Sequence, residues 1–253
     1  MRTKDLAVVG ICAALYAVVG RLTDFGVTFI GVAFWPAAVI PAIFAVLYGP
    51  LVGGLGAAIG IFARDMLFHG DPLLSLTAGV SSNFVMFFII GYFSRRNLDR
   101  GKFLASAALA GIVVAAGLLL PTLILPAEFA AFTGLSTMSI ISISVLAFVF
   151  SLAVIAVISW RWSEWRSYSV GSVIGQGVGA IIVAIGVWAY SQLFFSASGY
   201  LKQPLNASLM PIIFVWTFAT EIPFVLLVGP AVLKVCYKAF PLLRTQKVEE
   251  RAN

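Results

Sequence analysis

The chain has 253 residues, of which 61% are apolar by a broad count and only 10% are charged, whereas soluble globular proteins hold roughly 45 to 50% apolar and about 25% charged residues. With a mean hydropathy of +1.06, this composition excludes a water-soluble enzyme, a nucleic-acid-binding domain and a disordered protein. The chain is therefore predicted to be an all-α, polytopic integral membrane helix bundle, with a single transmembrane domain over residues 1–253.

Length and hydropathy together predict about eight membrane-spanning helices. A helix needs about 20 mostly apolar residues to cross the bilayer, so eight helices would use roughly 160 residues and leave only short connections. In chain order, the apolar segments are residues 6–20, 32–48, 51–68, 73–93, 103–125, 138–160, 170–195 and 207–234. The first continues into Arg21 and Asp24 and is interpreted as a retained helix, not a signal peptide. Because only Gly49 and Pro50 separate the second and third segments, these two could instead form a broken or re-entrant element.

The distribution of basic residues predicts the orientation in the membrane. Cytoplasmic loops of membrane proteins are enriched in Lys and Arg. With the amino terminus inside, thirteen of the 16 basic residues fall on the cytoplasmic side, and only Arg21, Arg64 and Lys202 fall toward the outside. An even number of crossings returns the chain to the cytoplasm, where residues 239–253 are expected to form a basic tail. The predicted location is the cell membrane, multi-pass, with both termini cytoplasmic.

The densest polar cluster on the outer side follows the third apolar segment. Arg64, Asp65, His69 and Asp71 fall within eight residues. The two charges at the helix end could serve orientation by reaching the interface, or they could bind a ligand. His69 is the only histidine, which excludes a multi-histidine metal site, and the spacing of the two carboxylates is not specific for a divalent cation. No metal and no cofactor are therefore expected.

Glu221 is the most informative single residue inside a predicted span. A carboxylate near the middle of a membrane helix is costly, so its default interpretation is functional, with a partner. The sequence leaves Arg21, Asn83 or a substrate cation open as that partner, and it also allows a protonated Glu that serves helix packing alone.

Small side chains recur at spacings of three and four in the first segment. The stripe consists of Gly10, Ala13, Ala14, Ala17 and Gly20. Such a stripe allows a second helix to approach closely, either inside the same bundle or from a separate membrane subunit. The third segment carries a similar glycine ridge, which is assigned to packing inside the bundle.

No catalytic motif is present. The sequence lacks a Walker A motif, G-x-S-x-G and H-E-x-x-H, so we expect neither a catalytic residue nor ATP hydrolysis by this chain. If transport through the protein is driven by ATP, partner proteins must supply the ATPases.

Three stretches of the first 100 residues resemble a known family. Residues 4–20, KDLAVVGICAALYAVVG, combine a charged start, an apolar run and an A-x-x-x-A element at Ala13 and Ala17. Residues 41–65, PAIFAVLYGPLVGGLGAAIGIFARD, place a Gly-Pro turn before a glycine-rich helix that ends near an acidic residue. Residues 71–96 contain Asn83 and a double arginine. Together these stretches resemble the substrate-binding S components of energy-coupling factor (ECF) transporters, whose members usually have six helices, so that two helices would be additional here.

The resemblance implies a subunit that captures a small micronutrient, such as a vitamin or its precursor, in a pocket open to the outside. It also implies partners: a transmembrane T subunit, docked through Gly10, Ala13 and Ala17, and two ATP-binding cassette ATPases, with the lipid bilayer around the chain itself. The candidate substrate-binding residues are Trp35, Arg64, Asp65, His69, Asp71, Asn83, Trp188, Gln192 and Glu221. The alternative is a self-sufficient, proton-coupled secondary transporter that uses Glu221.

Overall fold

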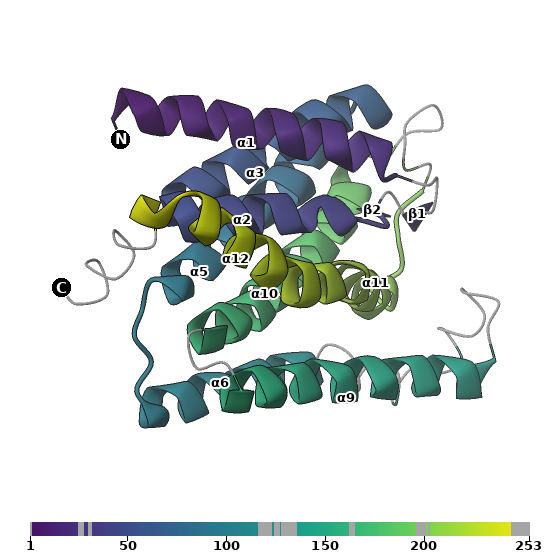
Figure 1. The fold of residues 1–253 in the computed structure, drawn as a ribbon. Helices are drawn as coiled ribbons and strands as arrows, with labels where there is room; N and C mark the ends of the chain where they lie inside the picture. The colour runs from purple at the N-terminus through teal and green to yellow at the C-terminus, as the bar shows by residue number, and fades with distance from the viewer. Residues whose placement is uncertain are drawn as a thin grey trace.

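The computed structural model describes residues 2–24, 28–29, 32–115, 123, 127, 136–161, 165–195, 201 and 203–243. Two predictions fall outside these residues: the end of the fifth apolar segment and residues 244–253 of the basic tail. Within them the chain is mostly helical (Figure 1).

The amino-terminal half contains a helix, a short hairpin and a series of packed helices. In chain order, these elements are α1 (Thr3–Leu22), β1 (Thr28–Phe29), β2 (Val32–Ala33), the 3₁₀ helix η1 (Pro36–Ala38), α2 (Val39–Tyr48), α3 (Pro50–Phe68), α4 (Pro72–Leu74), the π-helix η2 (Ser75–Val80), α5 (Ser81–Ser94) and α6 (Arg100–Val114). The two strands pair antiparallel and are a small departure from the predicted all-α architecture.

The carboxy-terminal half is helical in its described residues. It contains α9 (Thr137–Arg161), α10 (Arg166–Leu193), α11 (Leu209–Pro223), the π-helix η5 (Phe224–Val228) and α12 (Gly229–Ala239). The start of α1 and the end of α12 lie toward the same side of the bundle, as an even number of crossings would require (Figure 1).

Among the described residues, five helical segments are long and apolar enough to cross a membrane. They are Thr3–Leu22, Pro50–Phe68, Pro72–Ser94, Arg166–Leu193 and Leu209–Ala239. Two shorter apolar helices cover Pro36–Tyr48 and Gly101–Ile112. These segments support the prediction of a polytopic helical membrane protein, while eight crossings and cytoplasmic termini stay predictions.

The second predicted segment, residues 32–48, is not one continuous helix. It begins as strand β2, turns through η1, where Pro36 occupies the first helical position, and ends as the ten-residue helix α2. Pro41 lies in the first turn of α2, where a missing backbone N–H costs nothing. At a rise of 1.5 Å per residue, α2 is only about 15 Å long, half the thickness of the hydrocarbon core.

The glycine ridge of α3 confirms the prediction of close packing inside the bundle. A Cβ atom built on Gly56 would lie 2.6 Å from Sγ of Cys12, and one built on Gly60 would lie 2.7 Å from the carbonyl oxygen of Ala13. Because these positions lack side chains, α1 and α3 approach more closely than any larger residue would allow.

Helix α10 connects the two halves of the molecule. It packs against α5 on one side and against α11 and α6 on others, and 18 of its residues are buried. Helices α6 and α9 contact each other and form a layer at the edge of the bundle (Figure 1). The segments around α3, α5, α10 and α11 therefore form the interior in which a binding site can be enclosed.

Candidate functional site

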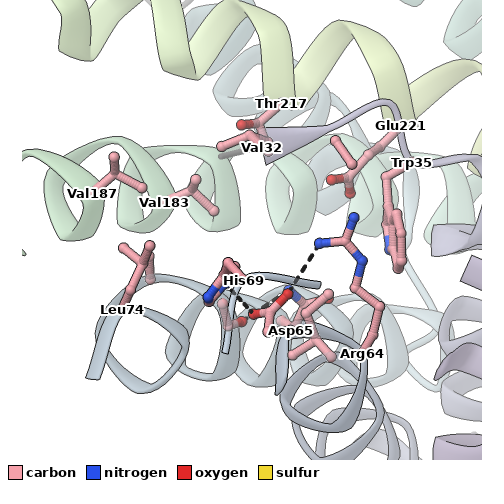
Figure 2. Close-up of a pocket in the computed structure, with 15 residues that line it drawn as sticks. Val32, Trp35, Arg64, Asp65, His69, Leu74, Val183, Val187, Thr217 and Glu221 are labelled. Carbon is pink, nitrogen blue, oxygen red and sulfur yellow. Dashed lines mark hydrogen bonds and ion pairs between the residues drawn. The ribbon is translucent and has the colours of Figure 1, made fainter. Parts of the chain in front are cut away.

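A cavity lies where α3, η2, α5, α10 and α11 meet the segment between β2 and η1. It holds about 590 Å³ of empty space, its mouth included. Ligand pockets commonly combine apolar walls with a few placed polar groups. The lining residues are Val32, Ala33, Trp35, Ile61, Arg64, Asp65, His69, Leu74, Ala78, Gly79, Asn83, Val183, Val187, Thr217 and Glu221 (Figure 2).

Arg64 is held in place from four sides. Its Nη2 donates to Oδ2 of Asp24 at 2.6 Å, and its Nη1 lies 3.2 Å from Oδ1 of Asp65. The guanidinium carbon also lies 4.7 Å from the ring centre of Trp35 and 4.2 Å from that of Phe68. With 2% of its surface exposed, Arg64 does not reach out to an interface but forms part of the cavity wall.

Asp65 links two further groups to this ion pair. Its Oδ2 accepts a hydrogen bond from Oγ of Ser75 at 2.8 Å and lies 3.8 Å from Nε2 of His69. Asp65 sits on α3 and Ser75 on η2, so the carboxylate connects two walls of the cavity. Both oxygens of Asp65 thus have neighbours inside the protein.

A second polar chain runs along the cavity from α1 to α5. Nε1 of Trp35 donates to the hydroxyl of Tyr16 at 2.7 Å, and this hydroxyl donates to Oδ1 of Asn83 at 2.5 Å. Nδ2 of Asn83 donates to the carbonyl of Gly79 at 2.9 Å. The predicted site residues Trp35 and Asn83 are thereby fixed by Tyr16, which the sequence analysis did not single out.

Glu221 differs from Arg64 and Asp65 because one of its two oxygens lacks a hydrogen-bond partner. The residue is 6% exposed, and its Oε2 has no hydrogen-bond partner among the described residues. The amide of Gln176 approaches Glu221 from α10, yet neither its nitrogen nor its oxygen makes a hydrogen bond. The sequence left Arg21 and Asn83 open as partners of Glu221, and neither forms a hydrogen bond or ion pair with it. Thr217, four residues earlier, lines the cavity from the same face of α11.

Three predicted site residues lie outside the cavity lining. Gln192 is exposed and donates to the carbonyl of Leu205, and Trp188 is half-buried on α10. Asp71 caps α4 by accepting from the backbone N–H of Leu74, and it accepts a second hydrogen bond from the hydroxyl of Tyr190. Burial raises the pKa of Asp71, but these hydrogen bonds outweigh it and hold the pKa below the ordinary value of 3.8. Asp71 therefore ties α4 to α10 as an ionised group.

The three predicted docking residues of α1 face different surroundings. Gly10 is exposed, with no atom within 4 Å of a Cβ built on it, whereas Ala13 is buried against Gly60 of α3 and Ala17 is half-buried. The exposed small surface of α1 thus passes through Gly10 and Ala14 and leaves Ala13 to the interior.

The structure brings six of the nine predicted site residues to one cavity, from segments far apart in the chain. Sequence reasoning missed Tyr16, Asp24, Ser75 and Thr217. Two of these residues could have been noticed in the sequence: Asp24 is a carboxylate that follows the first helix, and Tyr16 lies on the helix face that also carries Cys12 and Gly20. The sequence does not show which residues they contact.

Comparison with known proteins places the chain among membrane transport components. Residues 1–161 match the family model described as "ECF-type riboflavin transporter, S component". A UPF0397 protein of Aliivibrio salmonicida is 34% identical over 107 residues, which cover 41% of this chain and 56% of the relative. A UPF0397 protein of Lactobacillus delbrueckii subsp. bulgaricus is 30% identical over 102 residues, covering 40% of this chain and 54% of the relative. The chain thus spans about half the length of the curated relatives it matches, and no solved structure matches.

Proposed function

Because the chain belongs to the family of ECF-type riboflavin transporter S components, we propose that it is the substrate-capturing membrane subunit of an ATP-driven importer for a small micronutrient, a vitamin or its precursor. This is a family of transporter components, not of enzymes. S components generally work with a T subunit and ATP-binding cassette ATPases, and the lack of a nucleotide-binding motif in this sequence agrees with that division of labour.

The cavity around Trp35 is the observation that carries the proposal. Its walls combine apolar side chains, Ile61, Val183 and Val187 among them, with polar ones, of which Arg64 and Asn83 are held by Asp24 and Tyr16. Rigid polar groups in an apolar hollow bind a small planar molecule without a large cost in side-chain ordering. In the proposed cycle the cavity receives its ligand from outside the cell.

Two measurements test the proposal. Mild-detergent purification of the tagged protein from its own host, followed by mass spectrometry, is expected to recover a polytopic T subunit and two cassette ATPases. Reconstituted with these partners, the protein should take up its ligand only when ATP is present; riboflavin is the first ligand to test because the family description names it. Purification of the chain alone, under conditions that keep a known importer of this type intact, would contradict the proposal.

Glu221 supports a second candidate function. A buried carboxyl group beside a cavity, with one oxygen that has no partner among the described residues, is the kind of group that can exchange a proton as access to the cavity alternates. A self-sufficient proton-coupled transporter would take up substrate in liposomes without ATPases, following an imposed proton gradient, and would lose this uptake in Glu221→Gln. Uptake that requires ATPases and does not depend on the proton gradient would contradict the proton-coupled transporter and support the importer.

The topology that goes with the importer is also a proposal. It has eight crossings, a six-helix core with two additional helices, both termini in the cytoplasm and residues 239–253 as a basic tail there. The T subunit is proposed to dock on the small surface of α1 through Gly10 and Ala14, with the half-buried Ala17, one turn further along, at the edge of the contact. Labelling of single cysteines from either side of the membrane, near residues 3 and 240, tests the orientation.

A further inference from the structure

We infer that the ligand of the cavity carries a positively charged nitrogen with N–H donors, which pairs with Glu221. The inference rests on the proposed function and names the chemical class of its substrate. It comes from the charges around the cavity and from the hydrogen bonds that the described residues leave unmade.

Acidic groups outnumber basic groups at the cavity. Among the described residues at or next to it are three carboxylates, those of Asp24, Asp65 and Glu221, one guanidinium, that of Arg64, and one imidazole, that of His69, which lies 3.8 Å from Asp65. Arg64 is already paired, at 2.6 Å with Asp24 and at 3.2 Å with Asp65. Its guanidinium is therefore engaged by these two groups, and the carboxyl group of Glu221, whose Oε2 has no partner among the described residues, is left for a cationic group of the ligand.

One wall of the cavity has unfilled hydrogen-bonding capacity. Glu221 is more than nine-tenths buried, yet its Oε2 has no partner among the described residues. Gln176, fully buried behind it, likewise makes no hydrogen bond with either end of its amide. Buried polar groups are nearly always paired in folded proteins, and an unpaired one costs stability. A ligand that donates hydrogen bonds to Glu221 removes this cost.

The polar groups on α1, α3 and α5 already have partners. Tyr16 and Asn83 satisfy each other, and Asp65 already accepts from Ser75. Figure 2 shows Glu221 projecting from α11 into the space that Trp35 and Thr217 also border. The indole ring of Trp35 and the aliphatic wall formed by α10 suit the flat apolar body of such a ligand, while Glu221 suits its charged end.

The test uses two probes of nearly equal shape and different charge. Benzamidinium is a planar aromatic cation with N–H donors, and benzamide is its uncharged counterpart. Isothermal titration calorimetry on the purified protein in nanodiscs is expected to show that benzamidinium binds at least about tenfold more tightly than benzamide, because a buried charge pair contributes strongly to binding. Benzamide binding as tightly as benzamidinium, or no binding of either probe, would overturn the inference.

The variant Glu221→Gln removes the charge and keeps the shape. We expect it to lose the preference for benzamidinium, while Asp99→Asn, which removes a carboxylate from the exposed start of α6, keeps it. If Glu221→Gln does not fold, the comparison of the two probes on the natural protein still tests whether the cavity prefers a cation.

Riboflavin provides a further measurement, because it is uncharged. Tight binding of riboflavin that is equal in the natural protein and in Glu221→Gln would overturn the inference and leave the importer function standing. Conversely, recovery of the chain without ATPases or T subunit would contradict the importer function whatever the probes show. The two failures are thus distinguishable.

Discussion

Replacing Tyr16 by Phe tests whether the polar chain beside the cavity stabilises the bundle. Tyr16 is fully buried, and its hydroxyl both accepts from Trp35 at 2.7 Å and donates to Asn83 at 2.5 Å. The substitution removes one oxygen atom and leaves the ring, which contacts Trp35 and Phe87 edge to face, in place. It therefore isolates the two hydrogen bonds from the packing.

The expected loss of stability follows from the two hydrogen-bonding groups that the substitution leaves without a partner. An indole N–H and an amide oxygen lose their partners, and each unsatisfied buried group costs about 1–3 kcal/mol. Interhelical hydrogen bonds in membrane proteins average only about 0.6 kcal/mol each when measured singly, so we expect the lower part of that range for each partner. Tyr16→Phe should then reduce the free energy of unfolding by about 2–4 kcal/mol.

The assay is reversible unfolding by sodium dodecyl sulfate in mixed micelles, followed by circular dichroism. Tyr48→Phe is the matched control, because the Tyr48 side chain is 39% exposed on α2 and its hydroxyl removal should change stability by no more than about 0.5 kcal/mol. A loss for Tyr16→Phe as small as that of the control would refute the reasoning, because it would mean that the two partners find other hydrogen bonds at no cost.

Three further predictions concern the helix contacts and the loop before α4. Gly60→Ala should destabilise the fold by about 1–3 kcal/mol through overpacking against α1, whereas Gly10→Ala, with open space around it, should not, as measured by the same unfolding assay. Leucine at Gly10 and Ala17 should abolish ATP-driven uptake and leave ligand binding intact, because it obstructs the approach of a second subunit and not the cavity. The pKa of Asp71 in the folded protein lies below 3.8, so its carboxylate contributes its full stabilisation above pH 3.8 and loses it as the pH falls through the folded pKa. Asp71→Asn should therefore be less stable than the natural protein at pH 7 and equally stable in strong acid.

Each of these predictions has an outcome that contradicts it. Equal stability of the Gly60 and Gly10 variants would mean that α1 and α3 separate at no cost. Loss of ligand binding together with uptake in the leucine variants would make the small surface of α1 an internal contact. A stability difference between Asp71→Asn and the natural protein that persists in strong acid would show that the carboxylate does not act through its charge.

The sequence by itself determined the class of protein and the location of the charged cluster. The density of apolar residues predicts membrane helices because the hydrocarbon core demands about 20 such residues at each crossing. Arg64 and Asp65 lie in the last turns of α3 and His69 directly follows the helix, so their closeness in the chain already predicted a cluster. Glycines at a spacing of three and four on α3 likewise predicted close packing.

The tertiary structure alone decided which of these groups are satisfied and which are left for a ligand. Tyr16 and Asn83 are 67 positions apart, and their hydrogen bond depends on how α1 and α5 lie across α3. The same packing turns Gln192 away from the cavity, and it leaves Glu221 beside the cavity without a partner for its Oε2. Periodicity records which face of a helix is apolar, but the neighbour of that face is set by the packing of the whole bundle.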